Sequence, residues 1–322
     1  MNYPQQNGSV NTVHREQFLS YGILNVFLLF VMLLSIVSAQ SPPRVKITDL
    51  VDRMDENGYN RKYLPDAKEP YSGIVYNLYD NNQKEFEGFL TGGIQDSLWT
   101  WWYPNGQKKW QLTFKNYQKH GNWREWYESG QIKQEGKYRK GQKVGLWTLW
   151  YEDGHKSSEE RYEEDRLNGK IVLWYSNGQK EGEAKYIYGY KEGPDLGWYP
   201  SGEKKWEFFW KNGKEHGLQV EWYQNGNKKY EHNFRNGQWT GKLYEWYENG
   251  QPRIEGGFKV GVQDGPWTWW WNNGEIALKG NYSFGFPTGA WTWVSKLGKE
   301  TVKANPDADW VISKIEYFEK ER

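Results

Sequence analysis

Tyrosine recurs every 24 residues through most of this 322-residue chain, and no other feature constrains the fold as strongly. The series closes with a tryptophan and comprises Tyr79, Tyr103, Tyr127, Tyr151, Tyr175, Tyr199, Tyr223, Tyr247 and Trp271. A strict period of this length predicts a stacked repeat protein, in which each copy packs against its neighbours. Nine copies therefore occupy residues 79–294, and we call the residue that opens each copy its anchor.

Glycine stands three residues after the anchor in eight of the nine copies, and Asn82 takes its place in the first. Glycine and asparagine adopt positive φ at the least cost, and pairs such as Asn105-Gly106 are a strong hairpin signal. We therefore predict a β-hairpin with a two-residue turn in each copy. Further glycines, 14 and 18 residues after the anchor, predict a loop that carries the chain to the next hairpin. The expected fold is all-β, an elongated single-sheet solenoid of about nine stacked hairpins.

Counting back from a two-residue turn gives the cross-strand register. It places Trp123 opposite Gly136, Trp267 opposite Gly280, and Asp195 opposite Phe208. A large side chain opposite a small one is what a crowded sheet face needs, which supports this register.

The residue before each anchor in copies two to nine is a tryptophan, and alternation along a strand turns it to the face opposite the anchor. The same register gives this tryptophan row several basic partners, and a cation over an indole ring contributes about 0.5–1 kcal/mol at an exposed site. Aromatic rows of this kind suit a binding role. The predicted binding surface comprises Trp102, Trp126, Trp150, Trp222, Trp246 and Trp270 with Lys133, Lys229 and Arg253.

The strings WYESGQIKQEGKYRKGQKVGLWTLW and WYENGQPRIEGGFKVGVQDGPWTWW carry the repeat most clearly, and they resemble the MORN repeat in its bacterial-type variant. This resemblance implies an elongated sheet of hairpins and a scaffold or binding role. For some bacterial members it also implies an antitoxin or immunity role. The copies that begin at Tyr151 and Tyr175 depart from the pattern, with an acidic run at 163–165 and Asp195 in place of the usual tryptophan.

Residues 21–39 form the only long apolar run and follow Arg15. Val37 and Ala39 stand three and one residues before a cleavage site at Gln40, so residues 1–39 are predicted to be a secretory signal peptide. The alternative is an uncleaved single-pass membrane anchor, because nineteen apolar residues just suffice to span a bilayer. Either reading places the repeats outside the cytoplasm, secreted or in the cell envelope.

The two ends of the repeat array differ from its copies. Residues 40–78 are predicted to be a lead-in, helical or irregular, followed by a degenerate half-repeat around Tyr71-Ser72-Gly73. Residues 295–322 are predicted to hold a helix from Asn305-Pro306 to about Lys320, with Val311, Ile315 and Phe318 on one face. This helix is expected to cap the open edge of the last hairpin, the alternative being a helix that docks a partner.

No catalytic constellation, cofactor fingerprint or metal-binding motif stands in the sequence, so we expect a non-catalytic protein without a cofactor. Its 42 Lys and Arg against 41 Asp and Glu imply no global attraction to nucleic acid. Our first hypothesis is an exported scaffold that binds a protein, antitoxin-like in its most specific form. The second is a cell-surface module that binds glycans or membrane headgroups through the Trp and Tyr rows.

Overall fold

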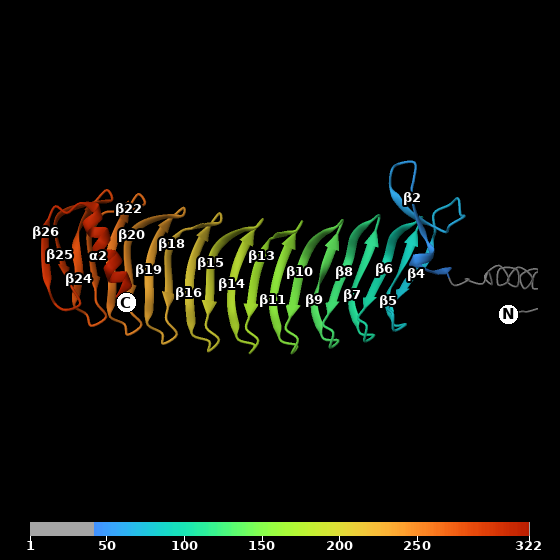
Figure 1. Cartoon of the computed structure of the whole chain (residues 1–322), viewed down its shortest axis with the longest axis horizontal. Coiled ribbons are helices and arrows are strands. Elements are labelled where there is room, and N and C mark those ends of the chain that lie inside the picture. Colours follow the sequence, from blue (N-terminus) through green and yellow to red (C-terminus); the bar gives the residue numbers. More distant parts are fainter. Residues whose placement is uncertain (1–41, 322) are drawn as a thin grey trace, which may run out of the picture. The chain divides into compact units, whose positions relative to one another are not determined.

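The computed structural model describes residues 42–321 (Figure 1). It separates two compact units, Met1–Arg44 and Val45–Arg322, and the repeats belong to the second. The predicted signal peptide or anchor, residues 1–39, lies outside the described residues. Between residues 42 and 321, no helix combines the length and the apolar character needed to cross a bilayer.

The second unit is built on one long open sheet in which successive strands pair antiparallel from β4 to β26 (Figure 1). The prediction of an all-β solenoid is therefore confirmed. Strands β12, β17 and β22 are short pieces that continue, after a break, into β13, β18 and β23. The strands are β4 (Gly73–Leu78), β5 (Lys84–Thr91), β6 (Ile94–Trp102), β7 (Lys108–Lys115), β8 (Gln118–Trp126), β9 (Ile132–Arg139), β10 (Gln142–Trp150), β11 (Lys156–Glu163), β12 (Arg166–Leu167), β13 (Gly169–Trp174), β14 (Lys180–Ile187), β15 (Tyr190–Trp198), β16 (Lys204–Lys211), β17 (Lys214–Glu215), β18 (Gly217–Trp222), β19 (Lys228–Arg235), β20 (Gln238–Trp246), β21 (Pro252–Lys259), β22 (Val262–Gln263), β23 (Gly265–Trp270), β24 (Ile276–Ser283), β25 (Phe286–Val294) and β26 (Glu300–Ala304).

The turn that follows each anchor contains three residues, so the prediction of two is wrong. In the second copy the N–H of Tyr103 donates to the carbonyl of Gln107, and the N–H of Gly106 donates to the carbonyl of Tyr103. Gly106 has φ of +87°, as a type I turn closed by a left-handed residue requires. The extra residue is offset by a bulge between Trp101 and Trp102, which restores the predicted register deeper in the hairpin.

A second tight turn, and no loop, joins one copy to the next. In the seventh copy Asn236 and Gly237 both have positive φ, +53° and +79°, which is the pattern of a two-residue type I′ turn. The predicted loop between the glycines at positions 14 and 18 is therefore wrong. The glycine at position 18, such as Gly241, lies within a strand, at a bulge where the register shifts.

The anchor tyrosines tie each hairpin to the following one. Every anchor hydroxyl donates to the backbone carbonyl 23 residues on, and in the ninth copy the indole Nε1 of Trp271 does the same to Val294. The eight tyrosine bonds measure 2.7–3.0 Å, for example 2.8 Å from Tyr199 to Trp222. The 24-residue period of the sequence thus corresponds to a ladder of hydrogen bonds that runs across the strands, beside the three-residue turns.

Tryptophan rings cover glycines on a neighbouring strand. The ring that covers a glycine does not belong to its predicted register partner but to a tryptophan on the strand at its other side. Trp123 is the register partner of Gly136, as predicted. The indole that covers Gly136 belongs to Trp147 on the following strand, and a Cβ at Gly136 would stand 2.2 Å from that ring. Trp267 covers Gly256 and Trp291 covers Gly280 in the same way. Trp147 and Trp291 are almost fully buried by this packing.

At the N-terminal end, a short segment lies on the face of the sheet that carries the anchors. The segment contains the 3₁₀ helix η1 (Ile47–Asp49); strand β1 (Arg44–Lys46), just before it, pairs with β4 in the sheet, and a separate hairpin of β2 (Val51–Met54) and β3 (Asn60–Tyr63) follows. Leu50 joins Val75, Leu90 and Trp99 in a buried cluster, with Val45 and Ile47 packed against it. Strand β4 pairs with β5, which is the pairing that the degenerate half-repeat predicts.

At the C-terminal end, helix α2 (Ala308–Lys320) confirms the predicted helix. Val311 and Phe318 are buried in the cluster that holds Trp271 and Trp293, so the helix lies on the face of the sheet. The expected cap over the sheet edge is wrong, because the additional strand β26 forms that edge. Its turn repeats the anchor pattern at Ser295 and Gly298, a signal that was available in the sequence.

Candidate functional site

The two faces of the sheet carry different side chains. We call the face that bears the anchors, and on which η1 and α2 lie, the inner face. The opposite face, which bears the tryptophan row, is the outer face. Since side chains alternate along a strand, Trp126 and Tyr127 lie on opposite faces, as predicted. The predicted binding surface combined residues of both faces, and the structure separates them.

The tryptophans of the outer face are half-buried, and five of the eight are covered by a lysine that stands just after the preceding three-residue turn. The Nζ atom of Lys84 lies 5.2 Å from the ring centroid of Trp102, and that of Lys204 lies 5.3 Å from Trp222. Lys108 covers Trp126, and Lys228 covers Trp246, at 5.6 and 5.8 Å. The predicted cation–π contacts thus exist with other partners, because the bulge beside the turn shifts the facing strand by one residue.

Most of these lysines are held by a glutamate three residues further on. Lys84 lies 3.1 Å from Glu87, and Lys204 lies 2.8 Å from Glu207. The ring faces of Trp102 and Trp222 therefore already have a cation in place, which speaks against an open cage for a glycan or a cationic headgroup. Trp150 and Trp270 differ, since Ile132 and Pro252 stand where the lysine would be, and no described Lys or Arg stacks on either ring.

Lys133, Lys229 and Arg253 lie on the inner face, so their assignment to the tryptophan row is wrong. The Nζ atom of Lys133 stands 5.8 Å above Tyr127 and 2.8 Å from the carboxylate of Glu125. Lys229 repeats this arrangement with Tyr223 and Glu221, at 6.0 and 2.8 Å.

Lys133 and Lys229 each donate a hydrogen bond to a glutamate. The bond from Lys229 to Glu221 raises the pKa of Lys229, and the bond from Lys133 to Glu125 raises the pKa of Lys133 in the same way. Both side chains are therefore charged at any physiological pH.

The middle of the inner face is lined by aromatic rings that neither η1 nor α2 covers. Phe208 and Tyr230 stack with centroids 6.3 Å apart, and Tyr230 stacks on His232 at 4.3 Å. Burial is the main cause that raises the pKa of Tyr230 above its usual range. His232 lies 3.3 Å from Glu245. Burial alone would raise the pKa of Glu245, but the hydrogen bond from His232 and the charge of Arg253 outweigh it and lower that pKa.

Two buried polar residues interrupt the aromatic column of the inner face, at the position held by Trp99 and Trp147 in other copies. Asp195 accepts from the indole of Trp206 at 3.1 Å and pairs with Lys191. Gln219 is almost fully buried and donates through Nε2 to the carbonyls of Phe209 and His216. The indole of Trp99 donates to the two equivalent carbonyls, so Gln219 reproduces the tryptophan's hydrogen bonds. The sequence marked Asp195 as a departure but not Gln219.

Within residues 42–321, no three His, Asp or Glu side chains stand close enough together to hold a metal ion. What recurs instead is a hairpin centred on the three-residue turn, with an ordered set of aromatic and charged side chains on each face. Five segments match the MORN repeat variant family. They are residues 95–116, 119–140, 215–236, 239–259 and 263–283.

The matched MORN-type segments make up about a third of the chain. The interval between them, 141–214, contains the acidic run and Asp195, where the repeat departs from its pattern. Repeats of this family generally take part in binding, so the match indicates a repeat-containing binding module. No curated protein matches the chain significantly.

Proposed function

We propose that this chain is a non-catalytic, exported scaffold that binds another protein along the uncovered middle of its inner face. The observation that supports this proposal is that α2 packs on the same face. Phe318 packs on Trp271 with centroids 5.3 Å apart, and Glu319 pairs with Arg253 at 2.5 Å. An aromatic side chain and a neighbouring carboxylate are thus among the contacts that hold this helix against a MORN-type repeat.

The central copies repeat the receiving side of this contact. Lys205 and Lys229 stand at the unit position of Arg253, and Glu221 stands at that of Glu245. The Lys229–Glu221 pair therefore corresponds to the Arg253–Glu245 pair that receives α2. The partner that suits these positions is an amphipathic helix with an aromatic residue followed by an acidic one. An immunity-type role, which the resemblance implies, is the most specific form of this proposal.

Adjacent lysines on opposite faces allow a matched test. We expect Lys205→Gln with Lys229→Gln, on the inner face, to reduce at least ten-fold the amount of one partner captured after cross-linking in the native cell. The control is Lys204→Gln with Lys228→Gln, which removes the same charge from the outer face. Mass spectrometry identifies the partner. Equal capture by both pairs, or loss only in the control, would rule out the inner face as the site.

Export is part of the proposal and rests on the apolar run of residues 21–39. Sequencing the N-terminus of the protein purified from its native cell tests it. A chain that starts at Gln40 supports a secreted or cell-envelope protein, and a chain that retains the run supports the single-pass anchor.

A further inference from the structure

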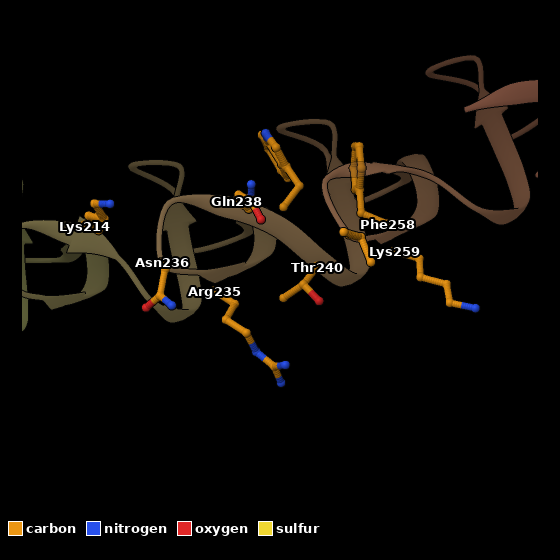
Figure 2. Close-up of a pocket in the computed structure, with 9 residues that line it drawn as sticks. Lys214, Arg235, Asn236, Gln238, Thr240, Phe258 and Lys259 are labelled. Carbon is orange, nitrogen blue, oxygen red and sulfur yellow. The ribbon is translucent and has the colours of Figure 1, made fainter. Parts of the chain in front are cut away.

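The outer face carries a strip of positive charge that the proposed function does not use. Along each returning strand, the residues 10 and 12 after the anchor flank an inner-face aromatic residue such as Tyr138 or Phe258, so both lie on the outer face. Figure 2 shows Arg235 and Lys259 extending to the side opposite Phe258. From the second to the eighth copy, eight of these fourteen positions are basic, and we call them the basic stripe: Lys115, Lys137, Arg139, Arg161, Lys185, Lys211, Arg235 and Lys259.

The stripe is exposed and uncompensated. All eight side chains are exposed, and none of them forms an ion pair within residues 42–321. Glu163 is the only carboxylate among the fourteen positions. The neighbouring column of glutamates does not neutralise the stripe, because its members are largely paired with other cations, for example Glu135 with Arg124 and Glu183 with Lys170.

The compensating carboxylates lie at the other end of the strands. The nine three-residue turns and the residues that close them carry seven exposed acidic residues and no Lys or Arg: Asp80, Glu128, Glu152, Asp153, Glu203, Glu248 and Glu275. The net charge of +1 is thus compatible with an exposed row of unpaired cations on the outer face. A row of like charges concentrates the field locally and attracts a polyanion even when the whole molecule is close to neutral.

We propose that the basic stripe binds a linear acidic polysaccharide laid along the outer face, across the strands. Each copy contributes two strands, so the cations recur at roughly 10 Å, twice the strand spacing. A polysaccharide in which every second sugar carries an acidic group presents charges at a comparable interval. A straight, extended chain can follow a straight row, whereas a nucleic acid duplex turns away from it.

The composition of the stripe favours a saccharide over single-stranded nucleic acid. Bases bind by stacking on aromatic side chains that alternate with the cations. Phe209 is the only aromatic residue among the fourteen positions of the stripe. Recognition here is therefore by charge and spacing, and it is expected to weaken steeply with salt.

Titration of the full-length chain with fluorescent hyaluronate and chondroitin sulfate tests this proposal. The stripe variant combines Lys137→Gln, Arg139→Gln and Arg161→Gln. We expect it to lose at least ten-fold in affinity. The slope of log affinity against log salt should fall by about two, since each removed cation contributes roughly 0.7. The matched control combines Lys68→Gln, Lys299→Gln and Lys320→Gln, three exposed cations outside the stripe, and should bind like the parent.

Four results would overturn the proposal. They are no binding of either polysaccharide by the parent at low salt, unchanged binding by the stripe variant, and an equal loss in the control. The fourth is tighter binding of a duplex DNA, or of phosphatidylglycerol vesicles, than of the polysaccharides. Circular dichroism of both variants distinguishes lost charge from lost fold. The inner-face lysine variants should leave this binding intact, so the stripe and the protein-binding proposal fail independently.

Discussion

At the scale of single residues, the anchor tyrosine of each copy makes a hydrogen bond to the next hairpin. The sequence shows this role only as a 24-residue period. The Tyr199 hydroxyl donates to the Trp222 carbonyl at 2.8 Å, so the ring both packs and satisfies a backbone acceptor of the next hairpin. Burial raises the pKa of Tyr199, so the hydroxyl keeps its proton at physiological pH. The ladder is therefore insensitive to pH in that range.

Removing one rung should have a measurable cost. Tyr199→Phe keeps the ring and leaves the carbonyl of Trp222 without its donor, which should lower the free energy of unfolding by about 1 kcal/mol. Urea denaturation followed by tryptophan fluorescence measures this. Tyr244→Phe is the control, because Tyr244 stacks on Trp246 and its hydroxyl has no partner among the described residues. Equal effects in the two variants would contradict a structural role for the rung.

In the candidate site, the alternation of side chains along a strand predicted the face of each residue but not its contacts. Trp126 and Tyr127 were placed on opposite faces correctly, because strand geometry alone decides this. The partner of Trp126 was not, because a one-residue bulge beside the turn places Ile132 opposite it, and Lys108 of the preceding hairpin covers the ring. Gln219 was missed, because the sequence does not show that the carbonyls of Phe209 and His216 converge on this position. Only the structure shows that Gln219 donates to them as the tryptophan of other copies does.

At the scale of elements, α2 is the one α-helix among residues 42–321 and covers the inner face of the last copies. Asp307 caps it by accepting from the N–H of Trp310 at 2.8 Å. This bond is the largest of the causes that lower the pKa of Asp307 below its ordinary value of 3.8. A lowered pKa stabilises the folded state above that ordinary value, and the stabilisation is lost as the pH falls through the folded pKa.

The cap therefore predicts a specific dependence on pH. Asp307→Asn retains a capping side chain but cannot ionise. We expect the parent to melt at a higher temperature than the variant at pH 6, and the difference to shrink as the pH falls below the ordinary value of 3.8 and through the folded pKa. Thermal melts of both proteins at several pH values test this, and a difference that stays constant with pH would show that ionisation of Asp307 does not stabilise the helix.

For α2, the sequence predicted the helix and its apolar face but not its position on the sheet. Its apolar face was readable from the spacing of Val311, Ile315 and Phe318. Its position was not predicted, because the turn signal at Ser295 and Gly298 was overlooked and, with it, the strand β26 that pairs along the edge of the last hairpin. With the edge paired, the remaining apolar surface is the inner face at Trp271 and Trp293, and the helix packs there.

At the scale of the whole molecule, the repeats make a structure in which each copy contacts its neighbours and little else. Ladder rungs, strand pairs and the tryptophans over glycines all join adjacent hairpins. Stability should then be a sum of local terms, with coupling limited to neighbouring copies.

Double substitutions test this additivity. Tyr127→Phe and Tyr223→Phe lie four copies apart, so their effects on the free energy of unfolding should add within about 0.5 kcal/mol. Tyr199→Phe and Tyr223→Phe are in adjacent copies and should deviate more from additivity. Urea unfolding of the single and double variants gives both values. Coupling of the distant pair as large as that of the adjacent pair would refute the nearest-neighbour description.

Periodicity and backbone chemistry were enough, in the sequence alone, to establish the hairpins, their register away from the turns and the face of each aromatic row. These properties depend on residues close together in the chain, such as Asn105 and Gly106, and on alternation along a strand. Only the tertiary structure decided that lysines of the preceding hairpin cover the outer tryptophans, that Lys133, Lys229 and Arg253 belong to the inner face, and that α2 lies on the sheet. The physical reason is that a single bulged residue, or one additional edge strand, changes which side chains meet, and the tyrosine period is the same in either case.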